Sequence, residues 1–187
     1  MATDPSSHSN FGAVRVSHEH FELDVNFSRK VIEGYATITA TVESDDAPRS
    51  LILDTSSGLS VSGVHHVVGT SEDAMEWSLG EAHAVLGTPL IVSLPPGLPK
   101  GASVTVGVRF ATAPTSSAIQ FLSPEQTAGR THPYLFTQCQ AIHARALLPC
   151  QDSPGAKMSY SAVVRVSAEL TALMSAVPAD DTSAVAG

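Results

Sequence analysis

The residues of this chain that could take part in chemistry are concentrated between positions 133 and 157. Within eight residues this stretch holds two amides, a thiol, an imidazole and a guanidinium, carried by Gln138, Gln140, Cys139, His143 and Arg145. A turn-forming sequence, Pro-Cys-Gln-Asp-Ser-Pro-Gly, follows at 149–155. Because a buried polar group without a partner costs roughly 1–3 kcal/mol, such a stretch is poor filling for a core. We therefore predict that it forms the functional face of the domain.

Cys139 and His143 are one candidate for catalysis, because a thiol nucleophile needs a base beside it. Their spacing of four residues places both side chains on one face of a helix or of a strand. On a strand, however, the two would lie about 13 Å apart at ~3.3 Å per residue, too far for proton transfer. We favour the common alternative, in which Cys139 is a small buried hydrophobic residue.

Gln138 and Gln140 are a second candidate, for binding rather than catalysis. Residues two apart on an extended segment share one face, so the two amides could meet a ligand together. Each amide offers a donor and an acceptor without charge, which suits a peptide backbone or an amino group. The residues alone favour the alternative, in which both amides bond to nearby loop backbone.

The eight histidines suggest metal binding at only one place. His18 and His20 lie two apart on a predicted strand and project from the same face, where they could share a metal ion. The apolar positions begin just beyond them, so we favour two solvent-facing imidazoles. His65 and His66 are adjacent and point to opposite faces, and no HExxH sequence occurs. The sequence therefore predicts no metal site in these residues.

Composition argues against several classes of partner. Eighteen acidic residues against ten basic ones give a net charge of −8, which disfavours nucleic acid, because its binding depends on Lys and Arg at phosphates. No apolar run is long enough to span a membrane, and the polar first ten residues do not resemble a signal peptide. We expect a cytoplasmic protein with no nucleic-acid or membrane partner, in which Cys139 and Cys150 stay reduced.

The pattern of apolar residues predicts the all-β fold that must position this stretch. Apolar and polar residues alternate along roughly ten short segments separated by turn residues, with almost no helical periodicity. We expect a β-sandwich or open barrel of mixed, mostly antiparallel sheets. The expected strands are 14–27, 31–42, 50–53, 59–68, 76–79, 83–86, 90–94, 103–110 and 158–166, with 168–174 either a helical turn or a last strand.

One face of each longer strand is apolar and is predicted to face the core. These inward residues are Phe21, Leu23, Val25 and Phe27, then Ile38, Ala40 and Val42, and then Val104, Val106, Val108 and Phe110. Residues 1–12 are expected to form a flexible N-terminal tail, and residues 178–187 a truncated C-terminal end. A single domain then spans residues 13–177.

The sequence Pro-Tyr-Leu-Phe-Thr-Gln-Cys-Gln-Ala-Ile-His-Ala-Arg at 133–145, followed by Leu-Pro-Cys-Gln-Asp-Ser-Pro at 148–154, resembles a known family. It is similar to the N-terminal domain of the M1 family of zinc aminopeptidases, specifically its leukotriene A(4) hydrolase branch. The resemblance covers about residues 15–177. Further matching segments are 20–25, 32–38, 123–127 and 170–176.

This resemblance implies a saddle-shaped β domain packed against a separate, thermolysin-like catalytic domain. In the family that second domain supplies HExxH and a more distant Glu as zinc ligands, and zinc polarises the scissile carbonyl and activates water. The resemblance also implies that the loop holding the amino end of a peptide substrate consists of Gln138, Cys139, Gln140 and Ala141. Zinc would then belong to the full-length parent and not to this fragment.

Gln140 indicates which branch of the M1 family the chain resembles. Many M1 aminopeptidases carry Glu at the matching position, which grips the free amino group ionically, whereas Gln140 can only hydrogen-bond. The leukotriene A(4) hydrolase group shares this feature and combines aminopeptidase with epoxide hydrolase activity; the second activity is left open, because the residues that open the epoxide lie mostly in the catalytic domain. We expect the substrate-loop domain of a zinc aminopeptidase, inactive by itself. The alternative is a non-enzymatic β-sandwich binding module.

Overall fold

The chain is built from strands and turns throughout the part that the structure describes, residues 4–179. A computed structural model has eleven strands and two single turns of 3₁₀ helix there, and no helix in this part could cross a membrane. The predicted all-β class is confirmed. Residues 1–3 of the expected tail and 180–187 of the expected C-terminal end lie outside the described residues.

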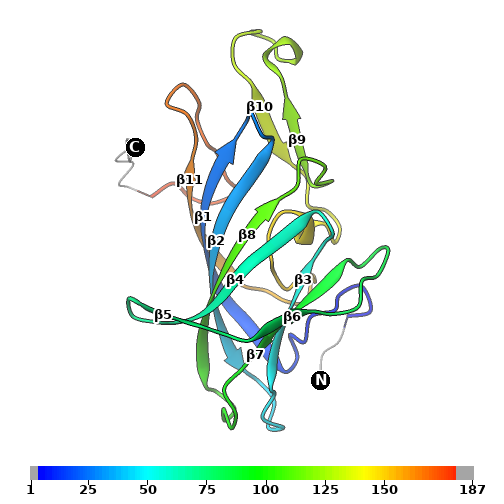
Figure 1. Cartoon of the computed structure of the whole chain (residues 1–187), viewed down its shortest axis with the longest axis vertical. Coiled ribbons are helices and arrows are strands. Elements are labelled where there is room, and N and C mark those ends of the chain that lie inside the picture. The colour runs from blue at the N-terminus through cyan, green and yellow to red at the C-terminus, as the bar shows by residue number, and fades with distance from the viewer. Residues whose placement is uncertain (1–3, 180–187) are drawn as a thin grey trace.

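The strands form three sheets (Figure 1). The largest has six strands in the order β11-β1-β2-β8-β4-β5; β11 runs parallel to β1, and every other neighbouring pair is antiparallel. A three-stranded sheet, β3-β7-β6, and a two-stranded ribbon, β10-β9, complete the fold. In chain order the elements are β1 (Val14–Asn26), β2 (Val31–Val42), β3 (Ser50–Thr55), β4 (Leu59–Val68), β5 (Ser71–Ala74), β6 (Trp77–Leu79), β7 (Thr88–Ser93), β8 (Ser103–Thr112), β9 (Ile119–Leu122), η1 (Pro124–Gln126), β10 (Tyr134–Thr137), η2 (Ala144–Ala146) and β11 (Ser159–Arg165).

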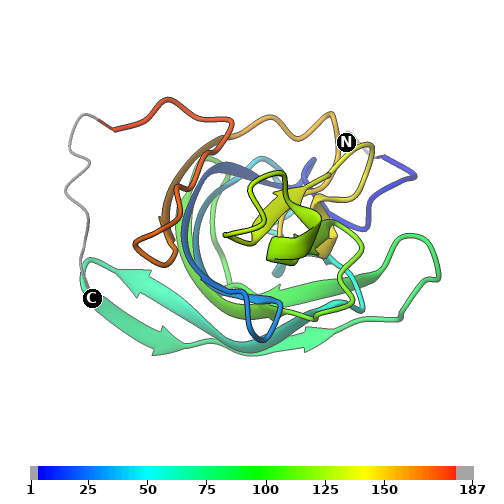
Figure 2. The ribbon, with the colours of Figure 1, turned by 90° about the horizontal axis from the view of Figure 1, so that it is seen from above.

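The alternation in the long strands sets the core, as predicted. The apolar residues expected to face inward from β2 and β8 are all buried, and in β1 Phe21 and Leu23 are buried and Val25 is half-buried. Seen from above, the six-stranded sheet is curved and β9 and β10 lie over the inside of its curve (Figure 2). The three-stranded sheet adds the fully buried Leu51, Leu53, Leu90 and Val92 to the same apolar cluster.

The first strand contains a β-bulge that changes which residues face the core. Its pairing with β2 shifts register between Val16 and His18. Val16 and Glu19, three residues apart, are therefore both buried. A bulge adds one residue to one strand, so simple alternation from Val14 does not predict that a carboxyl group enters the core.

One predicted segment differs from the structure, and another, which the sequence leaves open between a helical turn and a strand, is a turn. Residues 83–86, expected as a strand, form a turn in which the backbone of His83 and Gly87 exchange two hydrogen bonds of 2.8 and 3.0 Å. The Nδ1 atom of His83 accepts from the backbone N–H groups of Val85 and Leu86, so a local side-chain bond closes the turn instead of a ladder. Residues 168–174 contain one turn and no strand.

Candidate functional site

The predicted substrate loop, Gln138–Ala141, joins β10 to η2. The side chains of Gln138, Gln140 and Ala141 are exposed, and Cys139 is half-buried. Backbone hydrogen bonds fix both ends: Gln138 N–H donates to Ala118 O at 2.9 Å, and His143 N–H donates to Cys139 O at 3.0 Å. The peptide bond between Gln140 and Ala141 is cis. The structure therefore holds the four residues on the surface as an ordered bend.

The two glutamine amides have different surroundings. Gln138 Oε1 accepts a hydrogen bond of 3.2 Å from the backbone N–H of Gln140. No hydrogen bond ties the side-chain amide of Gln140 to any of residues 4–179. Because β10 ends at Thr137 and the chain turns at Gln140, the two-residue spacing of an extended strand does not apply here. The described residues thus leave both the donor and the acceptor of the Gln140 amide unengaged.

An exposed aromatic pair stands directly before this loop. Tyr134 and Phe136 project from one face of β10 with 55% and 42% of their surfaces exposed, and their ring centroids lie 6.2 Å apart. The opposite face of the ribbon packs inward, where Phe121 meets Phe27 edge to face at 5.7 Å. The β9–β10 ribbon is therefore anchored by one apolar face and presents the other to solvent.

The stretch after the loop is core, contrary to the expectation that all of 133–157 is a functional face. Arg145 and Gln151 are each 2% exposed, and Cys150 is 7% exposed. The buried side chains of Arg145 and Gln151 have hydrogen-bond partners, so burying them does not carry the free-energy cost of an unpaired polar group. Gln151 donates from Nε2 to Val14 O at 2.7 Å and accepts at Oε1 from Val16 N–H at 3.0 Å.

The guanidinium of Arg145 is the centre of this buried network. Its Nε donates to Asp152 Oδ2 at 2.8 Å, its Nη1 donates to Leu86 O at 2.7 Å, and its Nη2 donates to Ser6 O at 2.9 Å. The fully buried carboxylate of Asp54 lies 3.8 Å from Nη1. One side chain thus connects residues 145–152 to three segments that are distant in the sequence, and the planar fork of arginine suits such a multiple contact.

Residues 4–8, which belong to the expected tail, bond to this network. Asp54 accepts from the backbone N–H of His8 at 2.7 Å and from the hydroxyl of Ser7. Asp4 accepts from the hydroxyl of Ser153 and from Ser6 N–H at 2.9 Å. The hydrogen bonds from Ser153 and Ser6 lower the pKa of Asp4 to about 2.

Cys139 and His143 do not form a nucleophile and base pair. Among residues 4–179, the hydrogen bond between them is a backbone one. Partial burial raises the pKa of the Cys139 thiol, and the negative charge of Asp152 raises it further. A raised thiol pKa disfavours the thiolate that a nucleophile requires.

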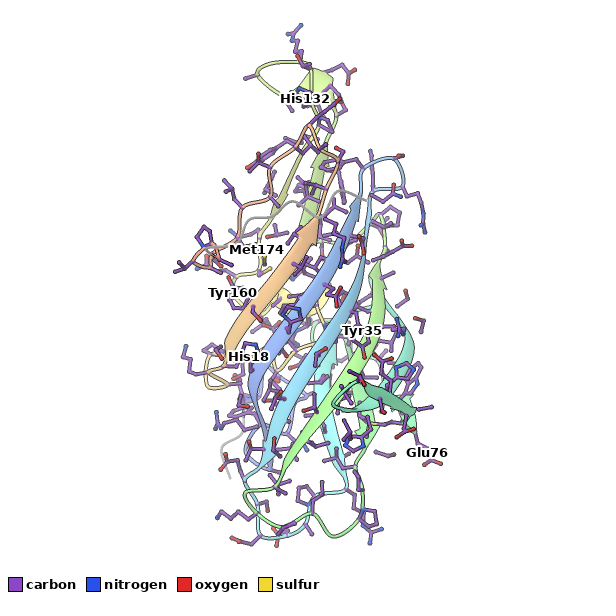
Figure 3. The ribbon with its side chains drawn as sticks, turned by 90° about the vertical axis from the view of Figure 1, so that its left-hand side faces the viewer. His18, Tyr35, Glu76, His132, Tyr160 and Met174 are labelled. Carbon is purple, nitrogen blue, oxygen red and sulfur yellow. The ribbon has the colours of Figure 1, made fainter. Side chains whose placement is uncertain are left out.

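The histidines considered as metal ligands are bonded to serines instead. Figure 3 shows the outer face of the six-stranded sheet with His18 labelled. Nδ1 of His18 lies 2.8 Å from Ser159 Oγ, and Nδ1 of His20 lies 2.8 Å from Ser161 Oγ, so both imidazoles join β1 to β11. Nowhere in residues 4–179 do three His, Cys, Asp or Glu side chains form a group that could hold a metal ion. The donor set that zinc requires is not found among the described residues.

A cavity of about 540 Å³ borders the downstream end of the loop. It is lined by Ile142, His143 and the segment around η2 on one side, and by small residues, hydroxyl residues, His83 and Val85 on the others. The lining segments are 56–58, 82–88, 115–117 and 142–146. The cavity therefore adjoins the residues that directly follow Gln138–Ala141.

Comparison with known proteins gives this geometry a context. Residues 15–186 match the model of the peptidase M1 N-terminal domain. Leukotriene A-4 hydrolase of Xenopus laevis is 43% identical over 175 residues, which are 93% of this chain and 28% of that protein. Leucine aminopeptidase 2 of Sclerotinia sclerotiorum is 33% identical over 187 residues, which are 100% of this chain and 30% of that protein.

Solved structures agree in fold. Yeast LTA4 hydrolase in complex with bestatin superposes with a TM-score of 0.76 at 30% identity, over 87% of this chain and 24% of that one. An M1 zinc metallopeptidase from Deinococcus radiodurans, at 17% identity and a TM-score of 0.59, shares the fold. The chain spans less than a third of the length of these curated relatives.

Proposed function

The chain belongs to the peptidase M1 N-terminal domain family, and on that premise we propose that it is the substrate-loop domain of a zinc aminopeptidase of the leukotriene A(4) hydrolase type. The parent protein removes residues from the amino end of peptides. The observation that carries this proposal is the exposed, ordered bend at Gln138–Ala141 with its free amide at Gln140. The names of the relatives, an aminopeptidase and a hydrolase, supply the reaction class.

The chemistry of the bend suits the amino end of a peptide. Gln140 Oε1 can accept a hydrogen bond from a substrate ammonium group, and its Nε2 can donate to the first peptide carbonyl. Gln138 keeps its amide N–H groups free in the described part of the chain, because only its oxygen is engaged there. Ala141 and Cys139 are small and leave room for the substrate backbone.

The remainder of the site lies outside this chain in our proposal. The described residues offer no donor set for zinc, so a catalytic domain of the parent supplies the metal ligands and the reacting groups. This domain contributes binding and orientation of the substrate. Interactions of that kind act equally on the ground state and the transition state, and they set KM more than kcat.

The experiment is a substitution in the full-length parent. We expect Gln140→Ala to raise KM for a leucine-initiated tripeptide about tenfold, with kcat and zinc content unchanged. Gln126→Ala, an exposed glutamine that bonds to the backbone of Ser123 on the neighbouring hairpin, is the matched control and should leave KM unchanged. Peptide kinetics that Gln140→Ala leaves unaltered would remove the loop from the site. A coding sequence without HExxH beyond Gly187 would favour the non-enzymatic module.

A further inference from the structure

The position of the Gln138–Ala141 loop depends on its two ends. None of residues 138–144 is buried, so the loop has no hydrophobic anchor of its own. At its upstream end, β10 and the hydrogen bond from Gln138 N–H to Ala118 O continue the ribbon. At its downstream end, Ile142 and His143 border the cavity described above. The first fixed side chain after the loop is Arg145.

Arg145 holds this downstream end through hydrogen bonds from both its backbone and its side chain. Its backbone N–H donates to Asp152 Oδ2 at 3.2 Å while its Nε donates to the same oxygen. The fork then reaches the carbonyls of Leu86 and Ser6, on the turn before β7 and on the N-terminal segment. The neighbouring carbonyl of Ala146 accepts from Ser116 Oγ at 2.6 Å.

Hydrogen bonds of Asp4 hold the N-terminal segment where the carbonyl of Ser6 accepts from Arg145. Asp4 bonds to both the backbone N–H and the hydroxyl of Ser6, at 2.9 and 2.6 Å, and to the hydroxyl of Ser153. These bonds orient the carbonyl of Ser6 toward Arg145. A carboxylate with a pKa of about 2 remains charged at every pH at which a peptidase would be assayed.

We propose that Arg145 is a positioning residue for the Gln138–Ala141 loop and that residues 4–8 act on substrate binding through it. This inference rests on the proposed function of the loop. Arg145 touches no substrate in this proposal; it places the free amide of Gln140. A shift of the loop would move this amide away from the amino end of the substrate and weaken the hydrogen bonds between them, because such bonds depend steeply on distance and angle.

The test uses the full-length parent and a leucine-initiated tripeptide. Arg145→Lys keeps the positive charge next to Asp54 and Asp152 but loses the planar fork that joins Leu86 and Ser6. We expect KM to rise about tenfold while kcat stays within about twofold. Arg165→Lys is the matched control, because Arg165 also pairs with two carboxylates, Glu22 and Asp24, but on the outer surface. The control should leave KM unchanged.

A milder variant keeps the proposal testable if Arg145→Lys does not fold. Asp4→Ala removes the bonds that orient Ser6 and leaves the buried charges in place. We expect about a threefold rise in KM with kcat unchanged, and faster amide hydrogen exchange at His143, whose N–H bonds to Cys139 O, in the full-length protein. A lowered melting temperature with unchanged KM and unchanged exchange would show a purely structural role and overturn the proposal.

The outcomes separate this inference from the function on which it rests. If Gln140→Ala leaves KM unchanged, the substrate loop itself is refuted. If Gln140→Ala raises KM but Arg145→Lys and Asp4→Ala do not, the loop stands and the positioning role fails. A rise in KM for all three, with the Arg165→Lys control unaffected, supports both.

Discussion

Glu19 on β1 lies directly opposite Ile38 on β2, and both side chains are buried in the core. On its other side Glu19 is paired with Tyr160 on β11, so neither residue directly opposite Glu19 is a cation. Glu19 Oε1 has no hydrogen-bond partner in the described part of the chain. Burial alone raises the pKa of this carboxyl from 4.5 to about 8, so the folded domain holds Glu19 protonated at neutral pH.

This buried carboxyl predicts a loss of stability as pH rises. Above pH 4.5 the unfolded chain releases the Glu19 proton, whereas the folded chain keeps it until about pH 8. The free energy of unfolding therefore falls across that window, by up to about 1.4 kcal/mol per pH unit, and levels off above it. Urea denaturation of the chain at pH 5, 6, 7 and 8 measures the slope.

Two substitutions isolate this contribution. Glu19→Gln removes the titrating group with little change in shape and should flatten the decline between pH 5 and 8. Glu22→Gln changes an exposed carboxyl that is paired with Arg165, and it should leave the decline as it is. An equal slope in the wild-type chain and Glu19→Gln would show that Glu19 does not carry the pH dependence.

We expect the uncharged side chain of Gln151 to contribute strongly to the free energy of unfolding. Its amide satisfies both the carbonyl of Val14 and the N–H of Val16, which lie just before the β1 bulge. Gln151→Leu leaves these two buried backbone groups without partners, at about 1–3 kcal/mol each. We expect the free energy of unfolding to fall by about 2–5 kcal/mol in urea titrations. Gln126→Leu, at an exposed position where only one hydrogen bond, from Ser123 N–H, is lost, should lower it by about 1 kcal/mol or less.

Gly87 and Gly97 have nearly equal φ values, but we expect substitution by alanine to destabilise the fold by different amounts. Gly87 and Gly97 have φ values of +80° and +77°. A Cβ at Gly87 would lie within 2.1 Å of the backbone carbonyl oxygen of Thr55, whereas a Cβ at Gly97 meets nothing within 4 Å. Gly97→Ala should therefore cost only the backbone strain, about 1–2 kcal/mol, and Gly87→Ala clearly more.

Thermal unfolding of the two alanine variants checks this difference. Because Gly87 follows Leu86, whose carbonyl accepts from Arg145, a forced shift at Gly87 should also loosen the network around that arginine. Similar melting temperatures for Gly87→Ala and Gly97→Ala would mean that the β3 backbone yields easily at Thr55.

Most of the fold followed from local patterns in the sequence. The long strands β2 and β8, and β1 after its bulge, have regular alternation, which predicts a strand with one buried face before its partners are known. The short strands β5, β9 and β10 were not predicted. They contain four residues each and few buried side chains, so their pairing depends on the neighbouring strand rather than on their own pattern.

Some residues of the candidate site can be recognised from the sequence, and others only from the folded structure. The sequence points to Gln138–Ala141, because the amides of Gln138 and Gln140 stand out and the resemblance includes all four residues. Asp54 was not identified, since it follows the apolar run Leu-Ile-Leu as an ordinary strand end. Only the fold shows that it is fully buried near Arg145 and bonded to residues 7 and 8.

The sequence by itself determined the all-β class, the inward faces of the long strands and the family, because alternation and a continuous motif are local properties of the chain. The tertiary structure decided which half of the 133–157 stretch faces solvent. Arg145 and Gln151 are as polar as Gln138 and Gln140, and no local signal separates them. Burial depended on partners distant in the sequence, the carbonyls of Ser6, Val14 and Leu86, that only the folded chain brings within hydrogen-bonding distance.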